Sequence, residues 1–566
     1  MAETADISPG TPAGAPSGAR TRRPNLLPTA VLLLGATLVY GVLCYQVLFN
    51  GHTSAAEVTY LIKSWWYASG VVAPYTATDA TGQMPFYFYQ LGVWQQLEGL
   101  GHIPGRLASI SLGIINGLLL FDICKRISAN TLVAAAAVFV FLATPATAFY
   151  FATATPTATV SALHLVAVWL IVTSLGKPRV WATVLMGALC AVLYFYHQNM
   201  ILAVVVLAPL YVAAIGRKRP LHGAVLLVTI AVVAAAVLFS FPEKLSEYAL
   251  RLPVVSPLLE KAGVLAPNFV LIDKGTSDAI TMAPAFERFA PADLLDTFLL
   301  PYSGTLILAL LLLALTGAGL RVLWLAPLYF LWLAAGHYLG ALGFCGRCML
   351  SYAPYFSAIG ALAGALSLAM IAHRARARGI PAAPPVLIGA VVAVALNAFA
   401  PHFALSDDAR DFPIPLMTQP YAATELADID IMARWIASNA PAHEPILVLH
   451  SLGKQKLPTL PYAAFLAGHM IPVQSLNPAS SKRILSTKLS ASAREAVQAA
   501  IEEESLWSDE TLSRWLDRDY DVVLFQEDKT SDQRAMIAAM SKNFDVAAST
   551  VFRGQNVFLY KRKPVQ

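Results

Sequence analysis

The chain has 566 residues, of which 57% are hydrophobic and 13% are charged, and its mean hydropathy is +0.60. Soluble domains carry about 25% charged residues, so this composition excludes an ordinary soluble protein and favours one built into a lipid bilayer. The net charge of +5 is best explained by Lys and Arg in cytoplasmic loops, and no nucleic-acid-binding motif accompanies it. The five cysteines are too few and too dispersed for a disulfide scaffold.

The N-terminal residues 1–24 are rich in Ala, Gly, Pro, Ser and Thr, which cannot build a packed core. They predict a disordered cytoplasmic tail. The apolar run that follows has nearly the length of a membrane span, and the tail before it is long for a signal peptide. We therefore expect this run to be retained as a first transmembrane helix.

Long apolar segments recur along residues 25–403. A helix needs about 20 apolar residues to cross the hydrocarbon of a bilayer, and about eleven such segments are present. They begin near Leu27, Leu107, Leu132, Thr157, Trp181, Ile201, Ala224, Gly304, Val322, Leu350 and Pro385. The sequence thus predicts a polytopic α-helical membrane domain over residues 25–403.

The loops between these segments predict the orientation, because short cytoplasmic loops hold most of the Lys and Arg. Every second connection is basic: CKR at 124–126, GKPR at 176–179, GRKR at 216–219, Arg321, and HRARAR at 373–378. Among the short connections between them, the turns near Tyr150 and Tyr196 carry no Lys or Arg, and the turn near Gly343 carries one. An odd number of spans then places the C-terminal region on the outer side, together with two large loops, 50–106 and 241–303.

The composition of residues 404–566 changes to that of a soluble domain. Short β-rich runs at 446–450, 521–525 and 556–560 alternate with helical stretches such as 427–439. This alternation predicts a small periplasmic α/β domain. Because the domain has no Gly-rich phosphate loop, we interpret it as a structural or acceptor-positioning module.

The first outer loop begins with Glu57, Tyr60 and Ser64 at helical spacing. This pattern predicts a short helix on the outer membrane surface, with residues 65–67 (Trp, Trp, Tyr) as interfacial anchors. The acid of such a helix is either a surface charge or a catalytic base. The loop continues through a polar turn, a Pro followed by aromatic residues and a second amphipathic helix, and Arg106 opens the next span.

In this order of features the chain resembles the GT-C glycosyltransferases. The similarity is to the bacterial relatives of protein O-mannosyltransferases and of the enzymes that transfer aminoarabinose or galacturonic acid to lipid A. The residues that match in order and approximate spacing are Glu57, Tyr60, Gly70, Pro85 with Tyr87 and Tyr89, and Arg106 with Leu107. The segment GRCMLSYAPYF at 346–356 is similar to a late segment of the family. The resemblance is strongest over the first 130 residues.

The chain departs from the family pattern at two places. The family's leading acid aligns with Ala56, which leaves Glu57 as its substitute, makes Asp79 a candidate, or reflects a loss of activity. An acid often found at the outer start of the fourth span is absent from residues 152–164, which leaves a divalent metal without support. The one C-x-x-C pair, at 345–348, lacks the second pair that a zinc site needs. We predict no metal ligands.

The resemblance implies an inverting transfer of a sugar from a polyprenyl-phosphate donor to an acceptor hydroxyl at the outer membrane face. Such chemistry needs a carboxylate that accepts the hydroxyl proton, cations that stabilise the leaving phosphate, and an apolar groove for the prenyl chain. The resemblance gives the role of general base to Glu57, with Asp79 as the weaker alternative. No certain cofactor is implied beyond the lipid-linked sugar, which is a substrate.

Two arginines are the candidates for the donor phosphate, because the planar guanidinium makes paired bonds to phosphate oxygens. Arg347 is the one basic residue in its outer turn and matches the family's phosphate contact. Arg106 enters its span from the outside, against the usual charge distribution. It is either a structural ion-pair partner, which we favour, or a second phosphate contact.

Four further residues are candidates for substrate binding. Tyr60 and Tyr87 belong to the first outer loop, and His197 with Gln198 lies at the outer end of the fifth span. Other polar residues have simpler expectations. His164 and His337 lie within spans and are expected to make interhelical hydrogen bonds, and Lys63 is expected to be a solvated loop charge.

Two other functions remain open. Ala56 leaves room for a non-catalytic relative that binds prenyl lipid or scaffolds envelope assembly. A transporter is the other alternative, although no inverted repeat or broken, acid-bearing span is visible. The composition and the resemblance predict a bacterial inner membrane protein with a cytoplasmic N-terminus. Its expected partners are polyprenyl phosphate and an envelope lipid, glycan or protein acceptor.

Overall fold

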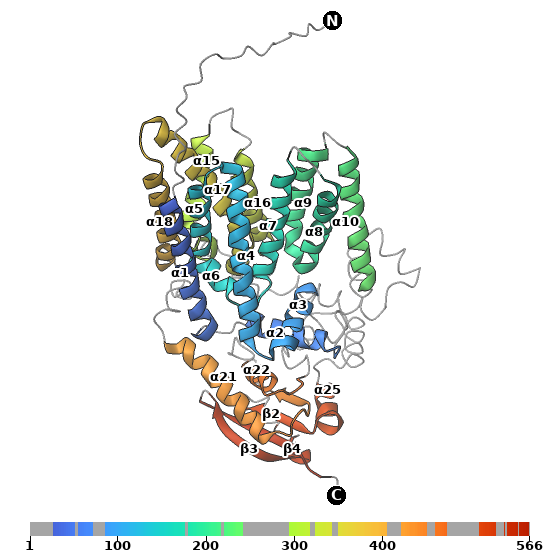
Figure 1. Cartoon of the computed structure of the whole chain (residues 1–566). Helices are drawn as coiled ribbons and strands as arrows, with labels where there is room; N and C mark the ends of the chain where they lie inside the picture. Colours follow the sequence, from blue (N-terminus) through green and yellow to red (C-terminus); the bar gives the residue numbers. More distant parts are fainter. Residues whose placement is uncertain are drawn as a thin grey trace, which may run out of the picture.

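The computed structural model describes the transmembrane and C-terminal regions in fourteen stretches. These are residues 26–50, 55–71, 85–175, 179–216, 220–241, 294–316, 323–341, 349–404, 420–449, 459–471, 509–527, 537, 540–552 and 554–564. A helical bundle occupies one end of the molecule and a small sheet the other, with two short helices between them (Figure 1). The predicted tail 1–24 and residues 242–293 of the second outer loop lie outside the described residues.

The bundle contains a helix at each of the eleven predicted segments. The helices are α1 Leu26–Asn50, α4 His102–Ser128, α5 Thr131–Leu142, α7 Thr157–Ser174, α8 Val180–Tyr196, α9 Ile201–Tyr211, α10 Pro220–Ser240, α15 Ser303–Leu315, α16 Leu325–Ala341, α17 Met349–Ala377 and α18 Ala383–Phe399. Short helices extend some of them: α6 Pro145–Phe151, η1 Gln198–Met200, η2 Val212–Gly216, η3 Leu295–Leu299 and η6 Ala400–Phe403. The chain bends by 69° between α5 and α6.

Six of the described helices are long and apolar enough to cross a membrane alone, and the bent pair α5–α6 makes a seventh. The apolar helices α8, α15 and residues 201–215 are shorter. The predicted fold class, a polytopic helical membrane protein with a small C-terminal α/β domain, is confirmed. The apolar composition of each segment explains this result, because a helix satisfies all its backbone hydrogen bonds without water.

Helix α17 forms the centre of the bundle. The protein buries 83% of its apolar window, against 22% for α1 and 11% for α10. Small residues at many positions of α17 let its neighbours α15, α16, α5 and α7 pack closely. The peripheral helices α1 and α10 leave most of their apolar surface exposed, where lipid can cover it.

A buried asparagine ties three helices together on the α18 side of the bundle. The side-chain amide of Asn397 donates to the hydroxyl oxygens of Thr144 and Thr305, each at 2.8 Å. Its carbonyl oxygen accepts the backbone N–H of Gly304 at 2.8 Å, at the start of α15. The amide is thereby hydrogen-bonded through both its oxygen and its nitrogen, as a buried polar group must be.

Helices α2 Ala55–Ala68 and α3 Phe86–Glu98 form a thin layer between the bundle and the sheet (Figure 1). A helix is therefore present at the predicted position, but it is packed inside the protein and does not lie on a membrane surface. Gly92 allows the two helices to touch, because a Cβ atom there would overlap the carbonyl oxygen of Ser64. The expected anchors are wrong in part: Trp66 and Tyr67 are buried inside the protein, where they pack against apolar residues rather than lipid.

The C-terminal region forms an α/β domain. Its elements are α21 Pro420–Asn439, β1 Ile446–Leu449, α22 Thr459–Leu466, α25 Asp509–Arg514, η8 Trp515–Asp519, β2 Val522–Gln526, β3 Phe544–Phe552 and β4 Gln555–Arg562. The strand order is β1-β2-β4-β3, with β1 and β2 parallel and the other pairs antiparallel. All three predicted strands are present, whereas the edge strand β3 was not predicted.

One hydrophobic cluster joins this domain to the α2–α3 layer. Val58, Leu61 and Phe88 from the layer belong to the same buried cluster as Ile429 of α21 and Leu460 of α22. The cluster continues into β1, β2 and β4. The C-terminal domain is thus packed directly on α2 and α3, the helices that carry Glu57, Tyr60 and Tyr87 (Figure 1).

Candidate active site

Glu57 and Arg106 form an ion pair beneath the α2–α3 layer. Glu57 lies in the first turn of α2, and Arg106 lies in the second turn of α4. The guanidinium donates from Nε to Oε1 and from Nη2 to Oε2 of the carboxylate, both at 2.8 Å. Both side chains are fully buried. This paired geometry is the strongest form of ion-pair hydrogen bonding in proteins.

Backbone groups from two other segments complete the pair. The Ala154 N–H, in the turn between α6 and α7, donates to Oε1 of Glu57 at 2.7 Å. Arg106 Nη1 donates to the carbonyl oxygens of Val47 and Leu48 in the last turn of α1. The pair therefore joins four segments of the chain. Desolvating two charges is costly, and such extra hydrogen bonds are what make a buried pair tolerable.

The guanidinium of Arg106 makes an ion pair, as the structural role that we favour would require. Glu57 has the position that the sequence predicts for the base, although Arg106 stabilises its charged form. The proposed base role of Glu57 and the phosphate role of Arg106 stay predictions. Within the described ranges, no group of three or more His, Cys, Asp or Glu side chains is placed to hold a metal ion.

Tyr60 and Tyr87 lie side by side above the pair. Their ring centroids are 5.3 Å apart in an edge-to-face arrangement, which is a favoured geometry for aromatic rings. Burial raises the pKa of Tyr87, and the charge of nearby Glu57 raises it further. A hydrogen bond with Ser109 acts in the opposite direction. The structure thus brings Tyr87 near the carboxylate and packs Tyr60 against Tyr87.

The outer domain also reaches this site. Tyr462 of α22 is fully buried, and its hydroxyl lies 3.3 Å from Nδ1 of His102, one turn before Arg106 on α4. Burial raises the pKa of Tyr462, and among its charged neighbours Glu57 raises it while Arg106 lowers it. Sequence reasoning did not single out this residue. Its burial in a segment so far along the chain is visible only in the fold.

The turn between α6 and α7 carries threonines where the family often has an acid. The hydroxyl oxygens of Thr153 and Thr155 are 3.2 Å apart, and those of Thr155 and Thr157 are 3.0 Å apart. Gln90 of α3 donates to Thr159 at 3.1 Å. This row is uncharged, and the Ala154 N–H within it is the group that contacts Glu57.

His197 faces the aromatic start of α17. Its ring lies 4.8 Å from the ring of Tyr355 and 5.6 Å from that of Tyr352, centroid to centroid. Burial lowers the pKa of His197 to about 3, and His337 contributes to the lowering. Its Nδ1 atom has no hydrogen-bond partner among the residues that the structure describes. The histidine is therefore neutral at physiological pH, with an acceptor nitrogen inside the protein.

The other two bundle histidines differ in their partners. His164 makes the expected interhelical hydrogen bond, because its Nε2 lies 2.7 Å from the hydroxyl of Tyr329 on α16. His337 instead bonds through Nδ1 to the carbonyl oxygen of Leu333 in its own helix. Within the described part of the chain, the buried Nε2 atom of His337 has no hydrogen-bond partner.

Lys63 corrects one expectation. We expected a solvated loop charge, but Lys63 is 2% exposed on α2. Its position could have been read from the sequence, because Tyr60, Lys63 and Tyr67 follow helical spacing and so share a face with the aromatic residues. The α2 helix thus carries a buried cation as well as the buried acid.

Three predicted site residues cannot be placed against these groups. Asp79 and Arg347 lie outside the described residues, as does the C-x-x-C pair at 345–348. The backbone of Gln198 belongs to the short helix η1 next to His197, and its side chain is outside the described part. Their predicted roles are retained below as proposals.

Comparison with known proteins shows which solved structures share this fold. No family model and no curated protein matches the chain. Among solved structures, ArnT from Cupriavidus metallidurans in the apo state is similar over 94% of this chain and 97% of its own length, with 16% identity and a TM-score of 0.53. The same protein bound to undecaprenyl phosphate gives 16% identity and a TM-score of 0.52. The chain has the GT-C fold.

The GT-C fold accounts for the order of elements around the ion pair. The first outer loop folds into two helices beside the bundle, and the chain then re-enters the membrane at α4, so Glu57 and Arg106 meet. An archaeal oligosaccharyltransferase from Archaeoglobus fulgidus also matches, with 13% identity and a TM-score of 0.43 over 95% of this chain and 74% of its own length. At these identities the likeness concerns the fold alone.

Proposed function

We propose that the protein transfers a sugar from a polyprenyl-phosphate donor to an acceptor hydroxyl at the outer membrane face, with inversion at the anomeric carbon. The observation that carries this proposal is the buried Glu57–Arg106 pair at the junction of the bundle and the outer domain. It lies in a GT-C fold similar to that of ArnT, whose structure is known with undecaprenyl phosphate. The acceptor is an envelope lipid, glycan or protein.

In the proposed reaction the acceptor oxygen attacks the anomeric carbon as its proton passes to Glu57. The bond between that carbon and the phosphate oxygen breaks, and polyprenyl phosphate leaves. Arg106 holds the carboxylate through both oxygens, which fixes the direction of the carboxylate but occupies the oxygens that would accept the proton. These bonds must therefore weaken as the proton arrives. Asp79 remains the alternative base.

Cations are required for the phosphate that leaves. Arg347 keeps this role in the proposal, as the family pattern implies. Lys63 is a further candidate, because it is a buried cation on the same helix as Glu57 and six residues further along. Tyr60, Tyr87, His197 and Gln198 are proposed to contact the sugar or the acceptor.

The proposal also covers the placement of the chain. We propose a bacterial inner membrane protein with residues 1–24 in the cytoplasm and residues 404–566 in the periplasm. The basic inner connections support this orientation. The packing of the outer domain on the α2–α3 layer supports it too, because the soluble domain and the first outer loop must then share one side.

A reconstituted assay tests the function. The purified protein in lipid nanodiscs is incubated with a panel of polyprenyl-phosphate sugars. The acceptor is supplied as an envelope extract from a strain that lacks this protein, and the released polyprenyl phosphate is measured. We expect release with at least one donor, and loss of release in Glu57→Gln. Lys63→Met is expected to raise the KM for the donor at least tenfold. Release by Glu57→Gln at the wild-type rate would exclude Glu57 as the base.

A non-catalytic relative is the second candidate. One observation that favours a non-catalytic protein is that both carboxylate oxygens of Glu57 already accept hydrogen bonds, from Arg106 and the Ala154 N–H. Another is the row of threonines at the position where the GT-C pattern often has an acid. Such a protein would bind polyprenyl phosphate without releasing it from any sugar donor. Binding in the same nanodiscs, measured with no turnover across the whole donor panel, would support this reading over the enzyme.

A further inference from the structure

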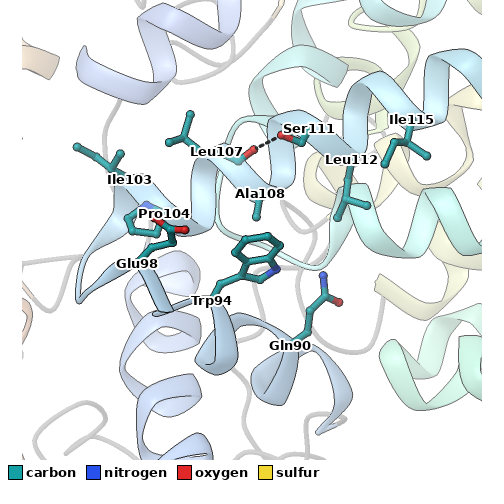
Figure 2. A pocket seen from close by; sticks show the side chains of 10 residues that line it. All are labelled: Gln90, Trp94, Glu98, Ile103, Pro104, Leu107, Ala108, Ser111, Leu112 and Ile115. Atoms are coloured by element: carbon teal, nitrogen blue, oxygen red, sulfur yellow. Dashed lines mark hydrogen bonds between the residues drawn. The ribbon is translucent and has the colours of Figure 1, made fainter. Parts of the chain in front are cut away.

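A groove of about 500 Å³ runs between α3 and the outer half of α4. Its walls are mostly apolar, with Leu107, Ala108, Leu112 and Ile115 on the α4 side. Figure 2 shows Trp94 and Gln90 projecting from α3 toward α4, with Glu98 beside Pro104 at one end. The volume lies within the range of about 300–1,000 Å³ that is usual for small-molecule sites.

The groove opens where lipid must lie. Leu107 and Ile115 are 48% and 46% exposed, respectively, on a helix that is long and apolar enough to span the membrane. From Ile103 to Ile115 a helix rises about 18 Å, which compares with about 15 Å for the hydrocarbon of one leaflet. The groove thus matches one lipid chain of the outer leaflet in both character and length.

The polar residues of the groove indicate which kind of lipid head group it would favour. Glu98 is exposed at the outer end, and among the residues that the structure describes, those lining the groove include no Lys, Arg or His. An anionic head group would meet this carboxylate without a compensating cation, whereas a primary ammonium would be attracted. Trp94, 40% exposed one turn before Glu98, has the amphipathic ring that favours the level of the ester groups.

We propose that this groove binds one acyl chain of an aminophospholipid, with the lipid's ammonium group at Glu98. The site is separate from the sugar-transfer reaction and does not depend on it. It also has a structural consequence. The two helices that form its walls also carry Tyr87 (α3) and Arg106 (α4), although neither residue lines the groove. An occupying lipid would therefore fill the space between the helices that hold these two residues.

Native mass spectrometry of the full-length protein tests the proposal. The protein is exchanged into an equimolar mixture of phosphatidylethanolamine and phosphatidylglycerol with identical chains, and retained lipid is counted. We expect wild type to retain phosphatidylethanolamine at least threefold over phosphatidylglycerol. Glu98→Gln should reduce this ratio to near one, and Glu98→Lys should reverse it. Because Glu98 is exposed, neither change removes a packed side chain.

A matched pair of variants separates this groove from the general lipid surface. Leu107→Trp places an indole over the groove, while Leu118→Trp makes the same change on the lipid-facing surface of α4 outside it. We expect retention to fall several-fold only in Leu107→Trp. Equal retention of both lipids by wild type, an unchanged ratio in Glu98→Gln, or equal losses in the two Trp variants would each overturn the proposal.

Discussion

Glu57 and Arg106 are both removed from water, and neither could keep its charge there without the other. The pair brings together α1, α2, α4 and the turn before α7, so it acts as a structural tie as well as a candidate catalytic group. These two roles have different energetic signatures, because a structural tie governs stability whereas a base governs only the rate.

Breaking one side of the pair is expected to be costly. Arg106→Met leaves the Glu57 carboxylate buried without its cation, which should lower the free energy of unfolding by about 3–5 kcal/mol. The double variant Glu57→Gln with Arg106→Met removes both charges and should recover most of that loss while remaining inactive. Thermal unfolding in detergent, together with the nanodisc assay, measures both quantities.

The exposed ion pair on the same helix provides the control. Arg126 contacts Asp122 at 2.6 Å, but the two side chains are 48% and 39% exposed. Exposed pairs contribute about 0–1 kcal/mol, so Arg126→Gln should change stability little. A double variant as unstable as Arg106→Met alone would show that the instability of Arg106→Met does not come from the unpaired buried charge of Glu57.

His197 predicts a dependence of stability on pH. Its pKa in the folded protein is about 3, below the ordinary histidine value of about 6.5, so the unfolded chain binds the proton more tightly. Stability should therefore fall as the pH falls from about 6.5 toward 3. His197→Asn should reduce the drop in Tm between pH 7 and pH 5, whereas the same change at exposed His402 should not. Equal drops in both variants and wild type would contradict this.

At the scale of elements, the bundle helices were predictable because each is a continuous apolar run that is visible in the local sequence without knowledge of its partners. The edge strand β3 was not, because it is mostly exposed and its residues FDVAASTVF lack a regular apolar alternation. The sequence predicted the helix α2 and placed Glu57 at its start, as the structure shows. The spacing of Tyr60, Lys63 and Tyr67 shows that these residues share a face, but not that the face is buried, because the residues that cover Trp66 come from distant parts of the chain.

The close approach of α2 and α3 gives an element-scale prediction. A Cβ atom at Gly92 would overlap the Ser64 carbonyl oxygen and the Ala68 Cβ, so Gly92→Ala must separate the two helices. We expect a loss of about 1–3 kcal/mol in stability, the usual cost of overpacking. The layer would also move relative to Glu57, so sugar transfer should fall with it.

Gly41 on α1 is the matched control, because nothing lies within 4 Å of a Cβ atom built there. Gly41→Ala should be neutral or stabilising by up to about 1 kcal/mol, since Ala favours the helix. Thermal unfolding of the two variants compares them directly. A Gly92→Ala variant as stable and as active as Gly41→Ala would show that the spacing of α2 and α3 is not critical.

At the scale of the whole molecule, the outer domain and the membrane domain share a core. Sequence composition separated them at residue 404. This division hid the fact that α22 packs against α2 and that residues of α21, α22 and β1 share one hydrophobic cluster with α2 and α3. Such contacts join residues hundreds of positions apart, so no local pattern predicts them. Tyr462 is the clearest case, since it reaches His102 across 360 positions.

The shared core predicts that the outer domain orders the active-site layer. Tyr462→Ala removes a fully buried ring between α22 and α4 and should lower the hydrogen-exchange protection of the α2 and α3 amides at least tenfold. Tyr560→Ala is the control, because Tyr560 is buried in a separate cluster on the sheet with Trp515 and Phe525. Both variants lose a large aromatic ring, at a cost of about 3–5 kcal/mol, but only the first should loosen the layer. Equal protection of α2 and α3 in the two variants would mean that the domain is attached to the layer without controlling its order.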